Sequence, residues 1–184
     1  MEISELKAEL ERLHGSSFGW ALSCCRRHRA EAEEVLQTVY LKILEGKTHY
    51  RGEASFKTWL FAVIRNTAIS EYRKSLLRLT VGSDQATVQS SLEEEPAAIF
   101  ERSEAQIRFQ SALEQLPARQ QQTLHLVFYQ DLSLREAADA MDISVGSVRK
   151  HYERGKKRLR ESLGQSEIGY GVKWRGKENP SVVS

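Results

Sequence analysis

The segment from Leu132 to Arg160 restricts the fold of this chain more than any other, because capping, turn and periodicity signals agree along it. Ser133 and Glu136 have the spacing of a capping box, so a helix is expected to begin there. Residues Asp142 to Gly146 suit a tight turn, and a second helical pattern follows at once. Two helices joined this closely predict a helix-turn-helix motif.

The two predicted helices each have a distinct inner face. In the first helix the residues expected to face inward are Leu134, Ala137, Ala138 and Met141, and in the second they are Val148, Tyr152, Gly155 and Leu159. The outer face of the second helix carries Arg149, Lys150, Glu153, Arg154 and Lys157. A basic helix of this kind suits the major groove of DNA. The alternative is an ordinary helical hairpin whose charged face is simply solvated.

The segment from Tyr50 to Lys74 predicts a helix with two apolar stripes instead of one. The stripe expected to face the core contains Phe56, Leu60, Val63, Ile64 and Thr67. Phe61, Arg65 and Tyr72 lie on the opposite side, where exposed rings and a guanidinium would suit the bases and phosphates of a single strand. The alternative is that Phe61 and Tyr72 pack against a neighbouring helix.

Helical periodicity dominates the chain and predicts an all-α fold. The expected helices cover 2–13, 17–28, 31–45, 55–76, 97–115, 119–129, 133–140 and 144–162. Residues 79–96 are polar and without a period, which is typical of a linker. We therefore expect two small helical domains, over 1–78 and 97–163, joined by this acidic flexible linker and followed by a disordered tail over 164–184. Drawn out, about eighteen linker residues could span roughly 60 Å, the length of about seventeen base pairs.

The net charge of +2 hides an uneven distribution. Between Arg149 and Arg160 there are seven basic residues and one acidic residue, whereas Leu79 to Glu104 hold six acidic residues and one basic residue. A nucleic-acid-binding protein with an acidic connector shows this asymmetry.

The cysteines and histidines argue against a metal site or an enzyme. Cys24 and Cys25 are adjacent, which suits a disulfide poorly and indicates a reduced, intracellular compartment. Cys24 and His28 lie four residues apart, but no second ligand pair follows, so we expect no metal and no cofactor. The histidines are scattered along the sequence and do not form the Ser-His-Asp order of a catalytic triad, and the sequence contains no phosphate-binding loop. Both observations disfavour catalysis. With no signal-peptide core and no apolar run that could span a bilayer, we expect a cytoplasmic protein without membrane insertion.

The order of these elements resembles the sigma factors of bacterial RNA polymerase, specifically the compact extracytoplasmic-function (ECF) group of the sigma-70 family. The resemblance covers roughly residues 17 to 163, and the segments that carry it are 32–44, 50–69 and 113–150. It implies an initiation factor that binds core RNA polymerase, directs it to promoters and assists promoter opening. Residues 1–78 would then form a region 2-like domain and 97–163 a region 4-like domain. The alternative is a stand-alone helix-turn-helix regulator whose amino-terminal half serves as a dimerisation module.

The resemblance also implies three groups of contact residues and their partners. The polymerase clamp helices would meet Glu31, Glu33, Glu34, Val35 and Gln37, beside the apolar ridge of Val35, Leu36 and Val39. The minus-ten element would meet Arg51, Gly52, Ser55, Phe56, Trp59, Phe61, Arg65, Asn66 and Arg73, with Asn66 and the preceding loop forming a pocket for a flipped base. The minus-thirty-five element would meet Ser147, Arg149, Lys150, Arg154, Lys157 and Arg158. The polymerase flap and an anti-sigma factor are the remaining candidate partners.

Within these groups the expected roles differ in detail. Phe61 and Arg65 are expected to be exposed strand contacts, whereas Trp59 lies on the flank of the core stripe and could serve in packing. Thr38 stands where the family usually has an acidic residue. Glu153 would repel phosphates unless it accepts from a cytosine amine. Gly155, in the middle of a helix, costs up to about 1 kcal/mol relative to alanine.

Overall fold

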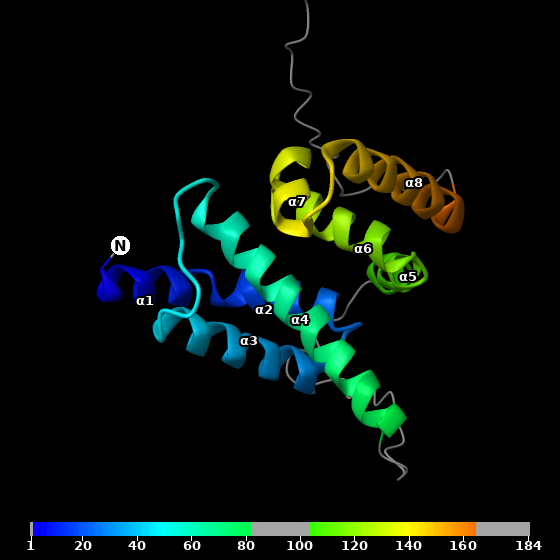
Figure 1. The fold of residues 1–184 in the computed structure, drawn as a ribbon. Helices are drawn as coiled ribbons and strands as arrows, with labels where there is room; N and C mark the ends of the chain where they lie inside the picture. The colour runs from blue at the N-terminus through cyan, green and yellow to red at the C-terminus, as the bar shows by residue number, and fades with distance from the viewer. Residues whose placement is uncertain (1, 82–103, 165–184) are drawn as a thin grey trace, which may run out of the picture.

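The computed structural model describes residues 2–81 and 104–164, and within these ranges the chain contains helices and loops without any strand (Figure 1). The helices in chain order are α1 (Ile3–Arg12), α2 (His14–Cys24), α3 (Arg29–Leu44), α4 (Phe56–Val81), α5 (Glu104–Glu114), α6 (Ala118–Leu124), the π-helical turn η1 (His125–Tyr129), α7 (Leu134–Met141) and α8 (Val145–Leu163). The all-α class is confirmed. The predicted linker over 82–96 and the predicted tail over 165–184 lie outside the described residues.

Several helix boundaries differ from the predictions; α2, for example, begins at His14 and not at residue 17. Helix α2 ends at Cys24 instead of residue 28, because Arg26 and Arg27 adopt positive φ angles of 51° and 65° that cannot continue a helix. Helix α4 continues to Val81, so the first three residues assigned to the linker are helical. The predicted helix 119–129 changes at His125 from an α-helix to a π-helical turn.

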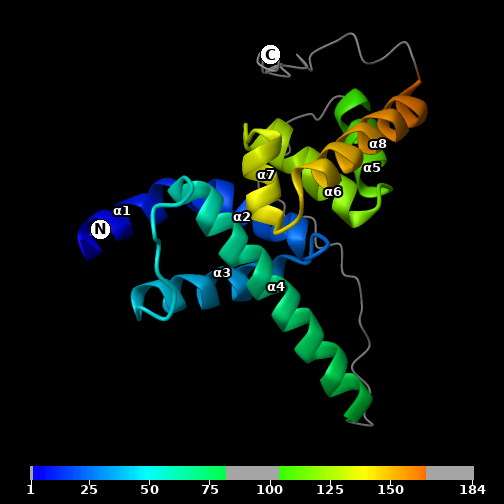
Figure 2. The ribbon, with the colours of Figure 1, turned by 45° about the horizontal axis from the view of Figure 1, so that its top comes forward.

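Helices α1 to α4 form the amino-terminal unit, which covers residues 2–81. Leu60 and Ile64 of α4 are fully buried and Thr67 is buried with them, which confirms the predicted core stripe of this helix. Ser55 caps the start of α4, because its hydroxyl oxygen accepts a hydrogen bond from the Thr58 backbone N–H at 3.1 Å. Both Figure 1 and Figure 2 show the second half of α4 extending beyond the other helices.

Helices α5 to α8 form the carboxy-terminal unit, which covers residues 104–164 and contains the predicted helix-turn-helix. The Ser133 hydroxyl accepts from the Glu136 backbone N–H at 3.2 Å, and the Glu136 carboxylate accepts from the Ser133 N–H at 2.9 Å, so the capping box is confirmed. Asp142 ends α7 in the left-handed conformation. The buried residues of α8 are the four that the sequence predicts, Val148, Tyr152, Gly155 and Leu159.

Gly155 allows α8 to cross α6 closely. A Cβ atom at this position would lie 3.1 Å from Leu124 Cδ1 and 3.4 Å from Gln120 Cβ, both on α6. These contacts are tighter than ordinary packing distances, so a larger residue here would require Leu124 or Gln120 to shift by a few tenths of an ångström. The cost of a glycine inside α8 is therefore offset by the packing that it permits.

The two units share one hydrophobic core. Helix α7 packs against α4, while α8 lies farther from the amino-terminal unit (Figure 2). One cluster of buried side chains includes Trp20 and Phe61 from the first unit and Leu126 and Met141 from the second. The Lys57 ammonium also donates to the Gln130 carbonyl oxygen at 2.7 Å across the boundary. We call this contact region the junction.

Candidate nucleic-acid interface

The acidic helix α3 has one exposed face and one core face. Glu31, Glu33, Glu34 and Gln37 are exposed, as a partner-binding role requires. Val35 is buried together with Leu36 and Val39, so the expected apolar ridge is the core face of the helix and Val35 cannot meet a partner in this arrangement. The reason is its position on the helix, about 180° from Leu44 and 120° from Leu41 at 100° per residue, which directs it toward α2 and α4.

Sequence reasoning missed the apolar residues that α3 does expose. Leu41 and Leu44 are 54% and 43% exposed. They follow Glu34 and Gln37 on the same side of the helix, because steps of three, four and seven residues return to one face. We call Glu34, Gln37, Leu41 and Leu44 the α3 outer face. This helical spacing was the signal that could have identified the two leucines.

The loop before α4 is supported by an aromatic cluster. The rings of Phe56 and Trp59 lie 5.3 Å apart, and Tyr50 lies 5.5 Å from Trp59. The Tyr50 hydroxyl donates to the Ala54 carbonyl oxygen at 2.6 Å, which fixes the turn. Phe56 and Trp59 are half-buried within this cluster, whereas the predicted contacts Arg51, Gly52 and Ser55 are exposed. The cluster therefore holds the loop in a defined conformation with its polar edge open.

The prediction that Phe61 faces solvent is wrong. Its side chain is fully buried at the junction, its ring stacks on Trp20 at 5.9 Å, and its carbonyl oxygen accepts from Trp20 Nε1 at 2.9 Å. The alternative of packing against a neighbouring helix is right for this residue, because Trp20 of α2 covers its ring. Tyr72, about three turns farther along α4 than Phe61, is 47% exposed and lies under the guanidinium of Arg26 at 5.2 Å.

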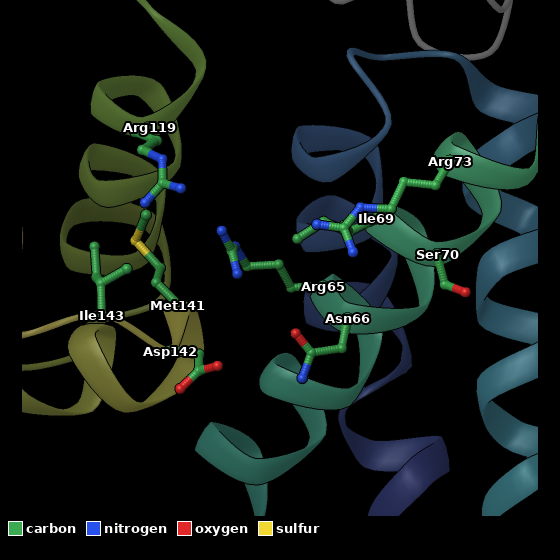
Figure 3. A pocket seen from close by; sticks show the side chains of 9 residues that line it. All are labelled: Arg65, Asn66, Ile69, Ser70, Arg73, Arg119, Met141, Asp142 and Ile143. Atoms are coloured by element: carbon green, nitrogen blue, oxygen red, sulfur yellow. The ribbon is translucent and has the colours of Figure 1, made fainter. Parts of the chain in front are cut away.

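A pocket of about 440 Å³ lies between α4 and the helix-turn-helix (Figure 3). We call it the junction pocket; its lining residues are Arg65, Asn66, Ile69, Ser70 and Arg73 from α4, and Arg119, Met141, Asp142 and Ile143 from the other unit. It brings together three predicted minus-ten residues, Arg65, Asn66 and Arg73. Asn66 and Arg73 are exposed, but Arg65 is only 8% exposed, so its expected exposure is also wrong.

Arg65 lies in the junction pocket with one of its guanidinium N–H donors unpaired. Its Nε atom is buried and has no hydrogen-bond partner. Burial lowers the pKa of Arg65 below its ordinary value; the nearby carboxylate of Asp142 opposes this shift and the like charge of Arg119 adds to it. Figure 3 shows the guanidinium groups of Arg65 and Arg119 extending toward each other from opposite sides of the pocket.

The basic face of α8 is open. Arg149, Lys150, Arg154, Lys157 and Arg158 are all exposed, as the sequence predicts. The Glu153 carboxylate lies 3.1 Å from the Lys156 ammonium, which reduces the repulsion that it would exert on a phosphate. Ser147 has a structural role as well, because its backbone N–H donates to the Ser144 hydroxyl at the start of α8 at 3.2 Å.

His125 is a half-buried titratable residue of the junction that sequence reasoning did not single out. Its ring lies 5.7 Å from Trp20 and 5.5 Å from Tyr129. Burial, together with the positive charges of Arg27 and Lys57, lowers the pKa of His125 to about 4. The ring is therefore neutral at pH 7.

The cysteines lie close to the junction as free thiols. Burial raises the pKa of Cys25 to about 12, and that of Cys24 is raised as well, so neither is an activated nucleophile at neutral pH. Within residues 2–81 and 104–164, no three His, Cys, Asp or Glu side chains are grouped so that they could hold a metal ion. No helix in the same ranges has both the length and the apolarity to cross a membrane.

Comparison with known proteins agrees with this architecture. The family model for sigma-70 region 2 matches residues 10–76, and the model for sigma-70, region 4, matches residues 106–159. The chain is 28% identical over 141 residues to the ECF RNA polymerase sigma factor SigX of Bacillus subtilis, covering 74% of this chain and 73% of SigX. It is 26% identical over 143 residues to the RNA polymerase sigma factor YlaC of the same organism, covering 77% and 83% of the two chains.

Two solved structures resemble this chain over both of its units. The sigma factor RpoE of Bartonella quintana, in complex with the anti-sigma factor NepR, matches with a TM-score of 0.71 and 25% identity over 86% of this chain and 96% of that chain. CnrH, in complex with the cytosolic domain of CnrY, has a TM-score of 0.54 at 17% identity over 86% and 88% of the two chains, which shows the shared fold alone.

The two sigma-70 regions, in this order on this fold, define a sigma factor of bacterial transcription. The chain belongs to the ECF group of the sigma-70 family. As such it binds core RNA polymerase and promoter DNA and directs promoter-specific initiation of transcription.

Proposed function

We propose that the two units divide the work of this sigma factor, with residues 1–78 acting as the region 2 domain and 97–163 as the region 4 domain. The α3 outer face, together with Glu31 and Glu33, would bind the polymerase clamp helices. Its two exposed leucines flanked by carboxylates suit a partner helix that offers both apolar and basic side chains. The loop before α4, with Asn66 and Arg73, would bind the minus-ten strand.

The observation that carries the DNA-binding part of this proposal is the division of α8 into two faces. Its apolar residues pack inside its own unit, and its five predicted basic contacts remain exposed. Arg149 and Lys150 would donate to guanine acceptors, whereas Lys157 and Arg158 would contact phosphates of the minus-thirty-five element.

Binding both promoter elements requires the two units to separate. The junction buries Phe61 and Arg65 and places the turn of the helix-turn-helix beside Asn66. A DNA strand cannot occupy this face of α4 while α7 covers it. A connecting segment that can span roughly 60 Å is long enough for the units to reach sites about seventeen base pairs apart.

We expect the protein to act as an initiation factor without catalytic activity. We expect it to work in the cytoplasm, where it meets the polymerase and the promoter. We also expect control by an anti-sigma factor, since a sigma factor of the same fold, 25% identical to this chain, is found in complex with one.

Purified full-length protein mixed with core polymerase tests the proposal. Co-elution with the polymerase and promoter-dependent run-off transcription are the expected results. Tight binding to duplex DNA without polymerase, and no co-elution, would instead favour a stand-alone regulator. The Asn66→Ala variant should reduce permanganate reactivity of the melted strand more than it reduces binding to closed duplex DNA. Unchanged reactivity would remove Asn66 from the strand site.

A further inference from the structure

We propose that the junction pocket is a binding site for the phosphate groups of a small molecule, and that this ligand holds the two units together. The site shares Arg65, Asn66 and Arg73 with the predicted minus-ten contacts, but it is formed by residues of both units. One of its three arginines, Arg119, comes from α6 and has no part in the proposed DNA contacts.

The charge of the pocket is the first observation that points to an anion. Arg65, Arg73 and Arg119 line it, and Asp142 is the one acidic residue among the nine lining residues. None of the three arginines forms an ion pair with another residue of the described ranges. Three guanidinium groups around one space repel each other unless a negative charge lies between them.

The unpartnered nitrogen of Arg65 is the second observation. The Arg65 side chain is more than nine-tenths buried and extends into the pocket, yet its Nε–H has no acceptor (Figure 3). A buried donor without a partner is costly, and a charged donor more so. The terminal N–H groups of the same guanidinium face the pocket (Figure 3), and a phosphate oxygen there would accept from them and compensate the buried charge, because guanidinium groups bind phosphate through paired hydrogen bonds.

The size and walls of the pocket indicate more than a bare ion. A volume of about 440 Å³ lies in the range of sites for small organic ligands. Ile69, Met141 and Ile143 supply apolar surface, and Asn66 and Ser70 supply polar groups that could orient an organic part. The chemistry therefore fits a phosphorylated metabolite, with inorganic diphosphate as the simplest ligand of the same class.

Such a ligand would favour the closed arrangement. It would contact Arg65 and Arg73 from one unit and Arg119 from the other, so it can bind fully only when the units are together. A ligand that binds one of two arrangements shifts the equilibrium toward it. The further consequence, that the ligand would lower promoter opening, rests on the proposed role of α4 in strand binding.

Isothermal titration calorimetry on the full chain, without polymerase or DNA, tests the site itself. Inorganic diphosphate and ADP are the probes, and adenosine and sulfate at matched ionic strength are the comparisons. We expect diphosphate or ADP to bind with a dissociation constant below about 1 mM. The Arg119→Ala variant should weaken binding at least about tenfold. Arg135→Ala removes an exposed arginine of α7 outside the pocket and should change it less than about twofold.

Comparing the affinities of the probes shows which part of the ligand the pocket binds. Equal affinities for diphosphate and ADP would assign binding to the phosphates alone, and tighter binding of ADP with none of adenosine would add a contact to the organic part. The proposal is overturned if sulfate binds as well as diphosphate, or if the two arginine variants lose affinity equally. It is also overturned if Arg119→Ala weakens a single-stranded oligonucleotide and leaves the small anions unaffected.

The folding of the variant is checked in the same samples. Arg119 is exposed, so Arg119→Ala should retain the wild-type far-UV circular dichroism and unfolding midpoint without ligand. Diphosphate should raise the midpoint of the wild type and not that of the variant. Loss of binding in this assay would leave the promoter function untouched, because polymerase and DNA take no part in it.

Discussion

Helices α4 and α8, which are both proposed to contact DNA, differ in whether the proposed contact face is exposed or covered. Helix α8 buries one face, Val148, Tyr152, Gly155 and Leu159, within its own unit and exposes its basic residues. Helix α4 is buried on two sides: by α2 and α3 on one side, and by α7 of the other unit on the second. One proposed DNA-binding face is therefore open in this structure and the other is covered.

This difference shows what a second apolar stripe on a helix can mean. Phe61 and Arg65 have the residue types of a strand-binding surface, and in this structure both are buried, Phe61 in the core cluster that the two units share and Arg65 in the junction pocket. If the minus-ten strand binds this face of α4 as proposed, the units must first separate. The packing of the units would then control the access of DNA to α4.

The largest expected effect comes from removing the ring at the centre of the covered face. Phe61→Ala leaves a cavity beside Trp20 and should lower the free energy of unfolding by about 3–5 kcal/mol, measured by urea denaturation. Tyr72→Ala on the exposed part of the same helix is the control and should cost less than about 1 kcal/mol. Equal losses for the two variants would mean that Phe61 is not packed at a junction.

On the open face, the expected effect is on sequence selectivity. Arg149→Ala should reduce discrimination at one base pair of the minus-thirty-five element by about 1–3 kcal/mol, measured by competition binding of the holoenzyme to single-substituted promoters. Lys157→Ala, at a proposed phosphate contact, should weaken all sequences alike. If Arg149→Ala also weakens all sequences equally, Arg149 is a backbone contact.

The junction should also respond to acid through His125. Its pKa is about 4 in the folded protein, compared with 6.5 ordinarily. Above pH 6.5 the ring is neutral in both folded and unfolded chains, so its contribution to stability is constant. Between pH 6.5 and 4 the unfolded chain takes up a proton that the folded chain excludes, so stability falls as the pH falls, by about 2 kcal/mol at pH 5.

Urea denaturation at pH 7 and pH 5, on the wild type and on His125→Gln, measures this contribution. The variant should lose less stability between the two pH values than the wild type does. The same pH dependence in both proteins would show that other groups, and not His125, cause the loss.

The smallest expected effect tests the packing behind the open face. Gly155→Ala places a methyl group 3.1 Å from Leu124 Cδ1, and the resulting strain outweighs the better helix propensity of alanine, for a net loss of about 1 kcal/mol by urea denaturation. Gly146→Ala in the first turn of α8 has only the Ser144 hydroxyl at 3.9 Å and should be neutral or stabilising. A stabilised Gly155→Ala would show that α6 and α8 can move apart.

The sequence predicted the helix-turn-helix almost completely, because its signals are local. The capping box at Ser133, the turn at Asp142 and the faces of α8 each depend on residues a few positions apart. The core stripe of α4 and the exposed carboxylates of α3 were predictable for the same reason.

The remaining features depend on contacts between distant parts of the chain. Whether Phe61 meets solvent, DNA or a second unit cannot be determined from the periodicity of one helix, since an apolar stripe has the same pattern in each case. The junction pocket brings Arg65 and Arg119 together from different units, and no spacing along the sequence encodes that meeting. Val35 was wrongly predicted to contact the polymerase, because the acidic residues around it suggested an interface but do not show which face of the helix Val35 occupies.

Distance measurement by pulsed electron paramagnetic resonance tests the exchange of partners most directly. Spin labels on noncanonical residues at Ser75 of α4 and Ser162 of α8, both exposed, leave the native cysteines in place. The free protein should give one narrow distance distribution, and the complex with core polymerase and promoter DNA should give a longer one, as the units separate within the reach of roughly 60 Å that the connecting segment allows. An unchanged distribution on forming the complex, or a broad one in the free protein, would contradict the account.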